Sequence, residues 1–535
     1  MLKRVKKSTY LILSLIILAF LLRIINFSFP SFTSDEARIS YRAFTISHFG
    51  KDELGRNWPF IFNSLADYQL PVTSYTTAAG IFLFGKGDFG ARIIFILFGV
   101  GVVFLGYKIG KVLSINKAFP LYMALVLAFS PVLIFLSKTP NDTILLLFLT
   151  ELIFYLQIAN KNRLLIILTL FFGLLVSKFA WFVMLPFLIF TLLFYQNNLS
   201  QKKKIKFIFV CIILTISMAL LFIKIPQFQR SILENNLLFF SDTSIQPAVN
   251  RLRGQGVESG WPNYLEKLIF NKLHFPTISV LHWLSTLSPH FYFGQFDKNG
   301  VWGFSQMGAF AKVLIVPFTA GLIYLLKKGK KSEKLILAYL IILTFPALFS
   351  YPTYPYVLMT LTIPFLALII SYGLLQFKRI FIILFAVGVV VEVGLNLLYI
   401  SPEIKNSNIL RPNFSKEITK DIYNFSKSQK VAVSDNIVEQ DIIPFIEWYE
   451  LKGMPQVPLD VDYPYKFRQF ALENIKIIGS DVTLSTCKYN DYPKVFLSKR
   501  DIERMRELNI KVDKVYKDSL NNDVVFTLER GLCIR

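Results

Sequence analysis

Long apolar runs are the feature that most constrains what this chain can fold into. The first extends from Tyr10 to Phe27, and similar runs of about 18 to 22 residues recur through the first 400 residues. A helix of that length crosses the hydrocarbon core of a bilayer, where every backbone polar group must be hydrogen-bonded internally. Hydrophobic residues make up 54% of the 535 residues. We therefore expect a mainly α-helical protein that crosses a membrane many times.

The start of the chain, MLKRVKKS, is basic and directly precedes the first apolar run. A cleaved signal peptide begins in the same way, but no small-x-small cleavage site follows this run. The chain continues instead with Ser-Phe-Pro-Ser-Phe and then the acidic pair Asp35-Glu36. We interpret the run as a retained first helix with its N-terminus in the cytoplasm, which predicts a multi-pass protein of the cell membrane.

Hydropathy and the basic connections together predict about eleven spans. They lie near residues 9–28, 91–108, 119–137, 143–159, 163–178, 179–196, 206–225, 309–327, 334–350, 355–376 and 380–400. The short basic connections, such as the run Lys202-Lys203-Lys204, then all fall on the inner side, as the positive-inside rule requires. We therefore attribute the formal net charge of +23 to membrane topology and not to nucleic-acid binding.

An odd number of spans puts the C-terminus outside. We predict two domains, a transmembrane domain over residues 1–400 and a small extracytoplasmic α/β domain over 401–535. The outer face of the first domain carries a loop over residues 29–90 and a second large loop over 226–308. Within these loops, residues 70–85 suit a re-entrant or interfacial helix, and residues 264–288 suggest an amphipathic helix that lies on the outer surface.

The tail differs in composition from the rest of the chain. Short β-prone runs begin at Lys430, Ile475, Lys494 and Asp523 and alternate with helical patterns such as Lys499 to Leu508, which predicts a mixed α/β domain. Its two cysteines, Cys487 and Cys533, lie in a compartment where a disulfide can persist, and the sequence leaves open whether they pair. Cys211 lies in an apolar span and is expected in the core.

Charged residues gather at the outer ends of the predicted spans, where they usually mark a pathway or a site. Asp35-Glu36 follows the first span, Asp142 opens the fourth, and Lys178 lies in the short turn between the fifth and sixth. Asp35 and Asp142 also fit helix N-caps, and Lys178 also fits a lysine that snorkels to the headgroups. Taken together, they fit a reaction at the lipid–water boundary. A carboxylate can accept a proton from an attacking group, and cations can hold the phosphate of a lipid-linked leaving group.

The first outer loop resembles that of a known family. The matching pieces are Asp35-Glu36-Ala37, Tyr41-Arg42-Ala43, Gly50-Lys51-Asp52-Glu53-Leu54-Gly55-Arg56, Pro59, Asp67-Tyr68, Pro71, Tyr75, Phe84-Gly85 and Ala91-Arg92, followed by Ser130-Pro131, Ser137-Lys138, Asp142, Asn250-Arg251, Arg253-Gly254, Asn271-Lys272 and Ser288-Pro289-His290-Phe291. In this order they resemble bacterial family 39-like glycosyltransferases. These are relatives of the dolichyl-phosphate-mannose-protein mannosyltransferases and include the aminoarabinose lipid A transferases. The resemblance covers roughly residues 10–400.

This resemblance implies a GT-C fold, with a multi-span bundle, interfacial helices and an outward-facing site. It implies a polyprenyl-phosphate sugar as donor and an acceptor outside the cytoplasm, with membrane lipids as further partners. The family's catalytic aspartate falls on Asp35, beside Glu36, and a second acidic residue falls on Asp142. Basic residues of the outer loops are implied to bind the donor phosphate. They are Lys138, Lys178, Arg92 and Arg42.

The sequence departs from the family pattern at two points. Where the family often has a lysine before proline, this chain has Gln69 in Asp67-Tyr68-Gln69-Leu70-Pro71. The basic residue that often precedes the proline of the tenth span is missing between Tyr354 and Pro364. Both departures affect the implied phosphate contacts and leave Asp35 and Glu36 unchanged.

Two other readings compete with the glycosyltransferase. A polytopic transporter or lipid flippase would carry out no bond chemistry, but it would typically show repeated halves and mid-membrane polar residues. A catalytically silent receptor with the same fold also agrees with the sequence. His274, His282 and His290 are spaced by eight residues and so rotate around a helix, which favours interfacial roles. We therefore predict no metal ligands and leave a divalent metal ion open as a cofactor.

Overall fold

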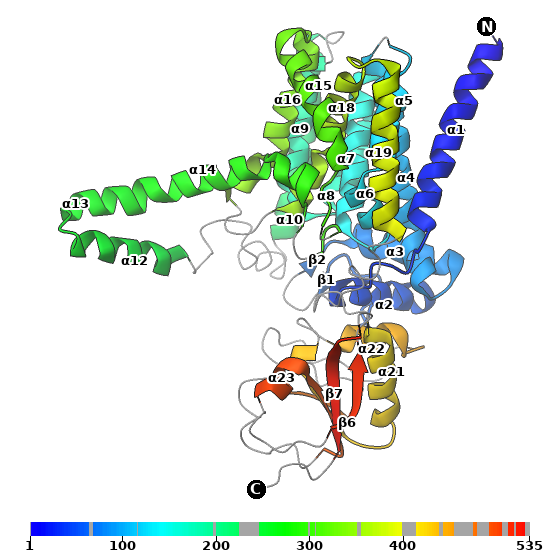
Figure 1. Cartoon of the computed structure of the whole chain (residues 1–535), viewed down its shortest axis with the longest axis vertical. Coiled ribbons are helices and arrows are strands. Elements are labelled where there is room, and N and C mark those ends of the chain that lie inside the picture. Colours follow the sequence, from blue (N-terminus) through cyan, green and yellow to red (C-terminus); the bar gives the residue numbers. More distant parts are fainter. Residues whose placement is uncertain are drawn as a thin grey trace.

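The computed structural model describes residues 2–63, 68–114, 116–195, 200–223, 245–297, 300–304, 306–349, 355–398, 414–437, 442–453, 474–478, 492–504, 512–517 and 521–529. A helical bundle forms one end of the molecule and a small α/β domain forms the other (Figure 1). A layer that contains α2 and α3 lies between them. The N-terminus and the α/β domain lie at opposite ends of the bundle, which is the arrangement that the predicted threading requires.

Helices of the bundle share one hydrophobic core, built mainly from leucine, isoleucine, valine and phenylalanine, with alanine, methionine and tyrosine among them. They are α1 (Leu2–Ile24), α4 (Asp88–Leu113), α5 (Phe119–Ala128), α6 (Pro131–Leu136), α7 (Asp142–Ile158), α8 (Arg163–Leu174), α9 (Lys178–Tyr195), α10 (Gln201–Ile223), η4 (Lys312–Leu314), α15 (Ile315–Lys327), α16 (Lys331–Thr344), η5 (Phe345–Phe349), α17 (Tyr356–Leu361), α18 (Ile363–Leu374) and α19 (Arg379–Leu398). These helices occupy the positions of the predicted spans, so the mainly helical, polytopic fold class is confirmed.

Among the described residues, four helices are long and apolar enough to cross a membrane. They are Asp88–Leu113, Lys178–Tyr195, Gln201–Phe222 and Tyr356–Leu374. The other predicted spans correspond to shorter or interrupted helices. The predicted span over 119–137 divides into α5 and α6, because Ser130 caps a new helix through Leu133 and Pro131 has no N–H to continue the old one. The count of about eleven spans stays a prediction.

The layer between the bundle and the α/β domain contains two helices and a short hairpin. α2 (Ser34–Phe49) ends at Gly50, which adopts φ +65°, and α3 (Pro71–Phe84) begins with a proline at its first position. Strands β1 (Phe62–Asn63) and β2 (Tyr68–Gln69) pair antiparallel between them. The predicted helix over residues 70–85 is thus confirmed as α3.

A helical arm projects sideways from the bundle (Figure 1). It consists of α12 (Ile245–Glu258), α13 (Asn263–Glu266), the π-helix η2 (Lys267–His274) and α14 (Phe275–Thr286), and the π-helix η3 (His290–Gly294) follows it. The helix predicted over 264–288 is confirmed. Leu268, Leu281 and Leu284 along it are exposed, and its location on a membrane surface stays a prediction.

The α/β domain holds a five-stranded sheet with strand order β4-β3-β5-β7-β6. Its elements are α21 (Ser415–Ser426), β3 (Val431–Ser434), η6 (Asp435–Ile437), α22 (Ile443–Tyr449), β4 (Ile475–Ile478), β5 (Lys494–Ser498), α23 (Lys499–Arg504), β6 (Val512–Lys517) and β7 (Asp523–Glu529). β3 runs parallel to β4 and β5, and β7 runs antiparallel to β5 and β6. The four predicted β-prone runs are all strands. Cys487, Cys533 and the predicted boundary at residue 401 lie outside the described residues.

Candidate active site

The N-terminus of α2 presents a single exposed carboxylate. Thr33 is the N-cap: its Oγ1 accepts a hydrogen bond from the Glu36 N–H at 3.2 Å, and the Glu36 Oε2 accepts one from the Thr33 N–H at 3.0 Å. This reciprocal pair is a capping box. Asp35 follows in the first turn, where the helix dipole favours a negative charge. Every residue from Ser34 to Ile46 is buried except Asp35, which is exposed.

These contacts change two sequence interpretations. Asp35 is not the helix cap, because Thr33 fills that role and Asp35 lies within the helix. Glu36 is buried, and one of its carboxylate oxygens is bonded to the Thr33 N–H, so its observed role is to fix the start of α2. Of the acidic pair, Asp35 is the residue whose side chain is exposed to solvent.

The second predicted acid, Asp142, begins α7. Asn141 is the cap of this helix, because its Oδ1 accepts a hydrogen bond from the Ile144 N–H at 3.1 Å. The interpretation of Asp142 as an N-cap is therefore wrong. Its carboxylate accepts a long hydrogen bond from the Thr143 hydroxyl at 3.4 Å and faces Ser177 and Lys178 at the start of α9. The structure thus places Asp142 and Lys178, which come from two separate turns, near each other.

Three buried cations surround the connection between α1 and α2. The Lys138 ammonium donates to the Ile25 carbonyl at 2.7 Å, and the Arg92 guanidinium donates to the carbonyls of Phe27 and Pro30, the latter at 2.7 Å. Arg23, near the end of α1, donates to the Ala19 carbonyl at 3.0 Å and to the hydroxyl of Ser137, the residue before Lys138, at 3.2 Å. Main-chain carbonyls therefore solvate much of this charge.

Burial and, to a lesser extent, like charges make Lys138 easier to deprotonate. Burial, together with the nearby guanidinium groups of Arg92 and Arg23, lowers the pKa of Lys138 to about 7. The three cations are buried close together near the start of the first outer loop. They create a positive electrostatic potential there, and this potential attracts an anion. Sequence reasoning named Lys138 and Arg92 and missed Arg23, although an arginine inside an otherwise apolar run was a signal for it.

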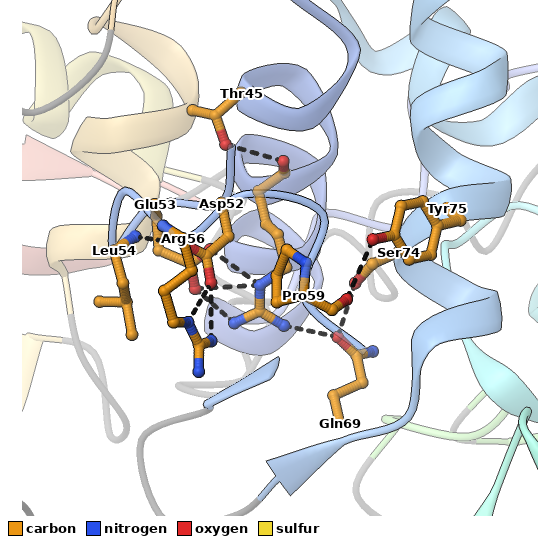
Figure 2. Close-up of polar contacts among 10 residues, drawn as sticks. Thr45, Asp52, Glu53, Leu54, Arg56, Pro59, Gln69, Ser74 and Tyr75 are labelled. Atoms are coloured by element: carbon orange, nitrogen blue, oxygen red, sulfur yellow. Dashed lines mark hydrogen bonds and ion pairs between the residues drawn. The ribbon is translucent and has the colours of Figure 1, made fainter. Parts of the chain in front are cut away.

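Arg42, the fourth predicted phosphate ligand, already has an anionic partner. Its Nε lies 2.9 Å from both carboxylate oxygens of Glu53, and its Nη1 donates to the Gln69 Oε1 at 2.8 Å (Figure 2). The Ser74 hydroxyl donates to the same Gln69 oxygen at 3.0 Å. Gln69, at the position where the family often has a lysine, is a neutral residue whose side-chain oxygen accepts hydrogen bonds from both α2 and α3.

The rest of this loop is also held by side chains. Asp52 Oδ1 accepts from the backbone N–H groups of Leu54 and Arg56, and its Oδ2 accepts from the Arg56 Nε at 2.7 Å (Figure 2). Tyr75 donates its hydroxyl to the Pro59 carbonyl at 2.9 Å. The charged stretch over residues 51–56 is therefore held by hydrogen bonds and ion pairs and supports α2 through Glu53, which the sequence alone did not indicate.

A metal centre is not assembled by the histidines that the structure describes. His282 is buried in α14 and His290 is exposed at the start of η3. Within the described ranges, no group of three His, Cys, Asp or Glu side chains could hold a metal ion. A divalent cofactor stays a prediction without a site in this part of the chain.

A family model matches part of the chain. Residues 69–222 match the family model described as dolichyl-phosphate-mannose-protein mannosyltransferase. This segment contains Gln69, Arg92, Lys138, Asp142 and Lys178, and the match confirms the resemblance to GT-C glycosyltransferases that the sequence motifs predict. A search of the curated proteins gives no match.

Solved structures to which this chain is similar at low sequence identity include the following two. One is ArnT from Cupriavidus metallidurans bound to undecaprenyl phosphate, with 12% identity, a TM-score of 0.48, and coverage of 100% of this chain and 99% of that chain. Another is the oligosaccharyltransferase AglB from Archaeoglobus fulgidus in complex with an inhibitory peptide and a dolichol-phosphate. It has 13% identity, a TM-score of 0.47, and coverage of 86% of this chain and 61% of that chain.

Proposed function

We propose that this chain, whose residues 69–222 match the dolichyl-phosphate-mannose-protein mannosyltransferase family, transfers a sugar from a polyprenyl-phosphate donor to an acceptor on the outer face of the membrane. The observation that carries the proposal is the exposed carboxylate of Asp35 on the otherwise buried first turns of α2. A buried cation contacts the chain just before it: the Arg92 guanidinium donates to the carbonyl of Pro30, five residues before Asp35. The Cα atoms of Pro30 and Asp35 are therefore at most about 18 Å apart.

The reaction we propose is a single displacement with inversion. A nucleophilic O–H or N–H group of the acceptor attacks the anomeric carbon, and the bond from that carbon to the phosphate oxygen breaks. Asp35 accepts the proton of the nucleophile as general base. The polyprenyl phosphate leaves with the electron pair of the broken bond and gains negative charge. Atoms and charge balance without an oxidant, a reductant or a further co-substrate.

We assign the leaving phosphate to the cations of the outer turns. Lys138 and Arg92 are buried beside the start of the first outer loop, and Lys178 begins α9 next to Asp142. Fixed positive charges stabilise the charge that develops on the leaving oxygen. Asp142 would orient the Lys178 ammonium. Arg42 is left out of this set, because Glu53 neutralises it, and we assign it to the support of the loop.

The test uses the full-length protein in nanodiscs, with undecaprenyl-phosphate mannose, glucose and arabinose as separate donors and a cell-envelope extract as acceptor. We expect one donor to release undecaprenyl phosphate only when the extract is present, and Asp35→Asn to abolish this release. Transport of the intact donor without release would favour the transporter or flippase instead. Binding of a donor without either event would favour a catalytically silent receptor.

A further inference from the structure

The α/β domain packs against α2 and shares a hydrophobic cluster with it. Phe32, Tyr41 and Phe44, from α2 and the residues before it, belong to the same buried cluster as Phe445 and Trp448 of α22. Phe32 is fully buried and Trp448 is 2% exposed, so both are removed from solvent at this interface. The α/β domain therefore contributes to the core around the helix that carries Asp35.

Phe32 is the contact closest to the candidate base along the chain. It directly precedes the N-cap Thr33 and lies three residues before Asp35. The indole of Trp448 lies 6.2 Å from its ring centroid, and the Arg92 guanidinium carbon lies 4.2 Å from the same centroid. An aromatic ring held by both an aromatic and a cationic neighbour loses rotational freedom. The residue before the cap is therefore fixed from the bundle and from the α/β domain.

Asp88 forms a second connection between the domain and the same loop. Its carboxylate accepts a hydrogen bond from the Trp448 Nε1 at 3.4 Å and forms an ion pair with Lys416 at 2.7 Å. Asp88 is the first residue of α4, and Arg92 follows one helical turn later. Because Arg92 donates to the carbonyls of Phe27 and Pro30, the α/β domain is linked through α4 to the backbone just before α2.

Lys86 contacts both the α/β domain and the middle of α2. Its ammonium donates to the Leu451 carbonyl and lies 4.5 Å from the ring centroid of Phe44 and 5.6 Å from that of Trp448. The Tyr41 hydroxyl donates to the Gly453 carbonyl at 2.8 Å. These contacts hold α22 and the residues after it along α2.

We propose that the C-terminal α/β domain positions the catalytic aspartate, and that Trp448 acts as a positioning residue through its contacts with Phe32 and Asp88. This inference rests on the proposed role of Asp35 in transfer. Trp448 touches neither Asp35 nor a substrate in this scheme. It fixes the loop from which α2 starts, and thereby the direction in which the Asp35 carboxylate points. A catalytic group that moves by about 1 Å can lose about 100-fold in rate.

The experiment compares three variants of the full-length protein in nanodiscs. Trp448→Ala removes both contacts, whereas Trp448→Phe keeps an aromatic ring against Phe32 and loses only the N–H. Tyr516→Phe is the matched control, because it removes one part-buried hydrogen bond, to Asp421 at 2.6 Å, that lies within the same domain and involves no residue of α2. Two readouts are measured. The first is amide hydrogen exchange of the peptide over residues 27–38. The second is kcat and KM for whichever donor the test of the proposed function identifies as active.

We expect Trp448→Ala to accelerate exchange at Thr33, Glu36 and Ala37 by about 10-fold or more, because the capped turn opens more often. Its kcat should fall by about 10- to 100-fold with donor KM within about threefold of wild type. Trp448→Phe should restore most of kcat, and Tyr516→Phe should match wild type in both readouts.

Unchanged exchange in Trp448→Ala would overturn the inference, and this readout does not depend on any sugar donor. An equal loss of kcat in Tyr516→Phe would also overturn it, because the effect would then reflect the stability of the domain in general. A wild-type protein that transfers no sugar would contradict the proposed function instead, and faster exchange in Trp448→Ala would still support the coupling of the domain to α2.

Discussion

Arg42 and Glu53 form an ion pair in which both side chains are 1% exposed. Arg42 lies in the middle of α2, and Glu53 lies in the loop that follows the helix. The same guanidinium stacks on the Phe62 ring, with its carbon 4.7 Å from the ring centroid, and donates to Gln69. One side chain therefore fastens α2 to both strands of the short hairpin, so α2 is held along its length as well as at its N-terminus.

Loss of the Glu53 charge should destabilise this region strongly. Glu53→Gln leaves the buried Arg42 charge without its anion, and removal of one partner of a buried pair typically costs about 3 to 5 kcal/mol. We expect a clear fall in the midpoint of thermal unfolding, measured by intrinsic fluorescence of the protein in detergent.

The neighbouring ion pair provides the control. Arg56 pairs with Asp52, but the Arg56 side chain is 38% exposed, and the buried Asp52 carboxylate also accepts from the backbone N–H groups of Leu54 and Arg56, which remain when the cation is removed. Arg56→Gln should therefore shift the unfolding midpoint much less than Glu53→Gln. Equal shifts for the two variants would mean that the burial of Arg42 does not determine the stability of the loop.

Substitutions of the adjacent residues Asp35 and Glu36 should have different effects on the transfer rate. Asp35→Asn keeps the size of the side chain and removes the base, so we expect a loss of about 10²- to 10⁴-fold in kcat with little change in unfolding temperature. Glu36→Gln keeps an oxygen that can accept from the Thr33 N–H, as Gln does in other capping boxes, and should retain most of the activity. The two rates are measured by release of polyprenyl phosphate. If Glu36→Gln were the inactive variant and Asp35→Asn the active one, the general base would have to be Glu36.

The sequence allowed local features to be predicted better than contacts between distant segments. Apolar run length located the helices, and β-prone runs located β3, β4, β5 and β7 of the tail but not β6, because both signals depend on nearby residues. The spacing of Thr33 and Glu36 is a capping-box pattern. This pattern alone identifies Thr33 as the helix cap, so the cap role need not be assigned to Asp35. Pro131 likewise marked the division of the span over 119–137.

Contacts between segments far apart in the chain could not be predicted in this way. Nothing near Trp448 in the sequence indicates that it packs on Phe32, and nothing near Asp142 indicates that Lys178 lies opposite. The alternatives for Arg42, a phosphate ligand or the partner of Glu53, differ only in tertiary packing. The class of chemistry was therefore accessible from residue types, and the division between supporting and reactive charges needed the three-dimensional structure.

The orientation of the chain in the membrane can be measured directly. The N-terminus and the α/β domain lie at opposite ends of the bundle, and the first turn of α10 contains Lys202, Lys203 and Lys204. By the positive-inside rule, a phosphatase reporter fused after Arg535 should be active outside, and one inserted at Lys203 should be inactive. An inactive reporter after Arg535 together with an active one at Lys203 would reverse the threading and would place Asp35 on a face without access to an outer acceptor.

Donor binding should weaken as the pH rises through about 7. In the free protein, burial and the Arg92 and Arg23 charges lower the pKa of Lys138 to about 7, from an ordinary value of 10.5. Below this pKa the ammonium is charged and can attract the donor phosphate, and above it the neutral amine cannot. The donor KM should therefore be constant below pH 7 and rise by up to about tenfold per pH unit above it, measured from pH 6 to 9. Lys138→Arg keeps its charge over this whole range and should flatten the profile. A wild-type donor KM that did not change between pH 6 and 9 would exclude Lys138 from the phosphate site.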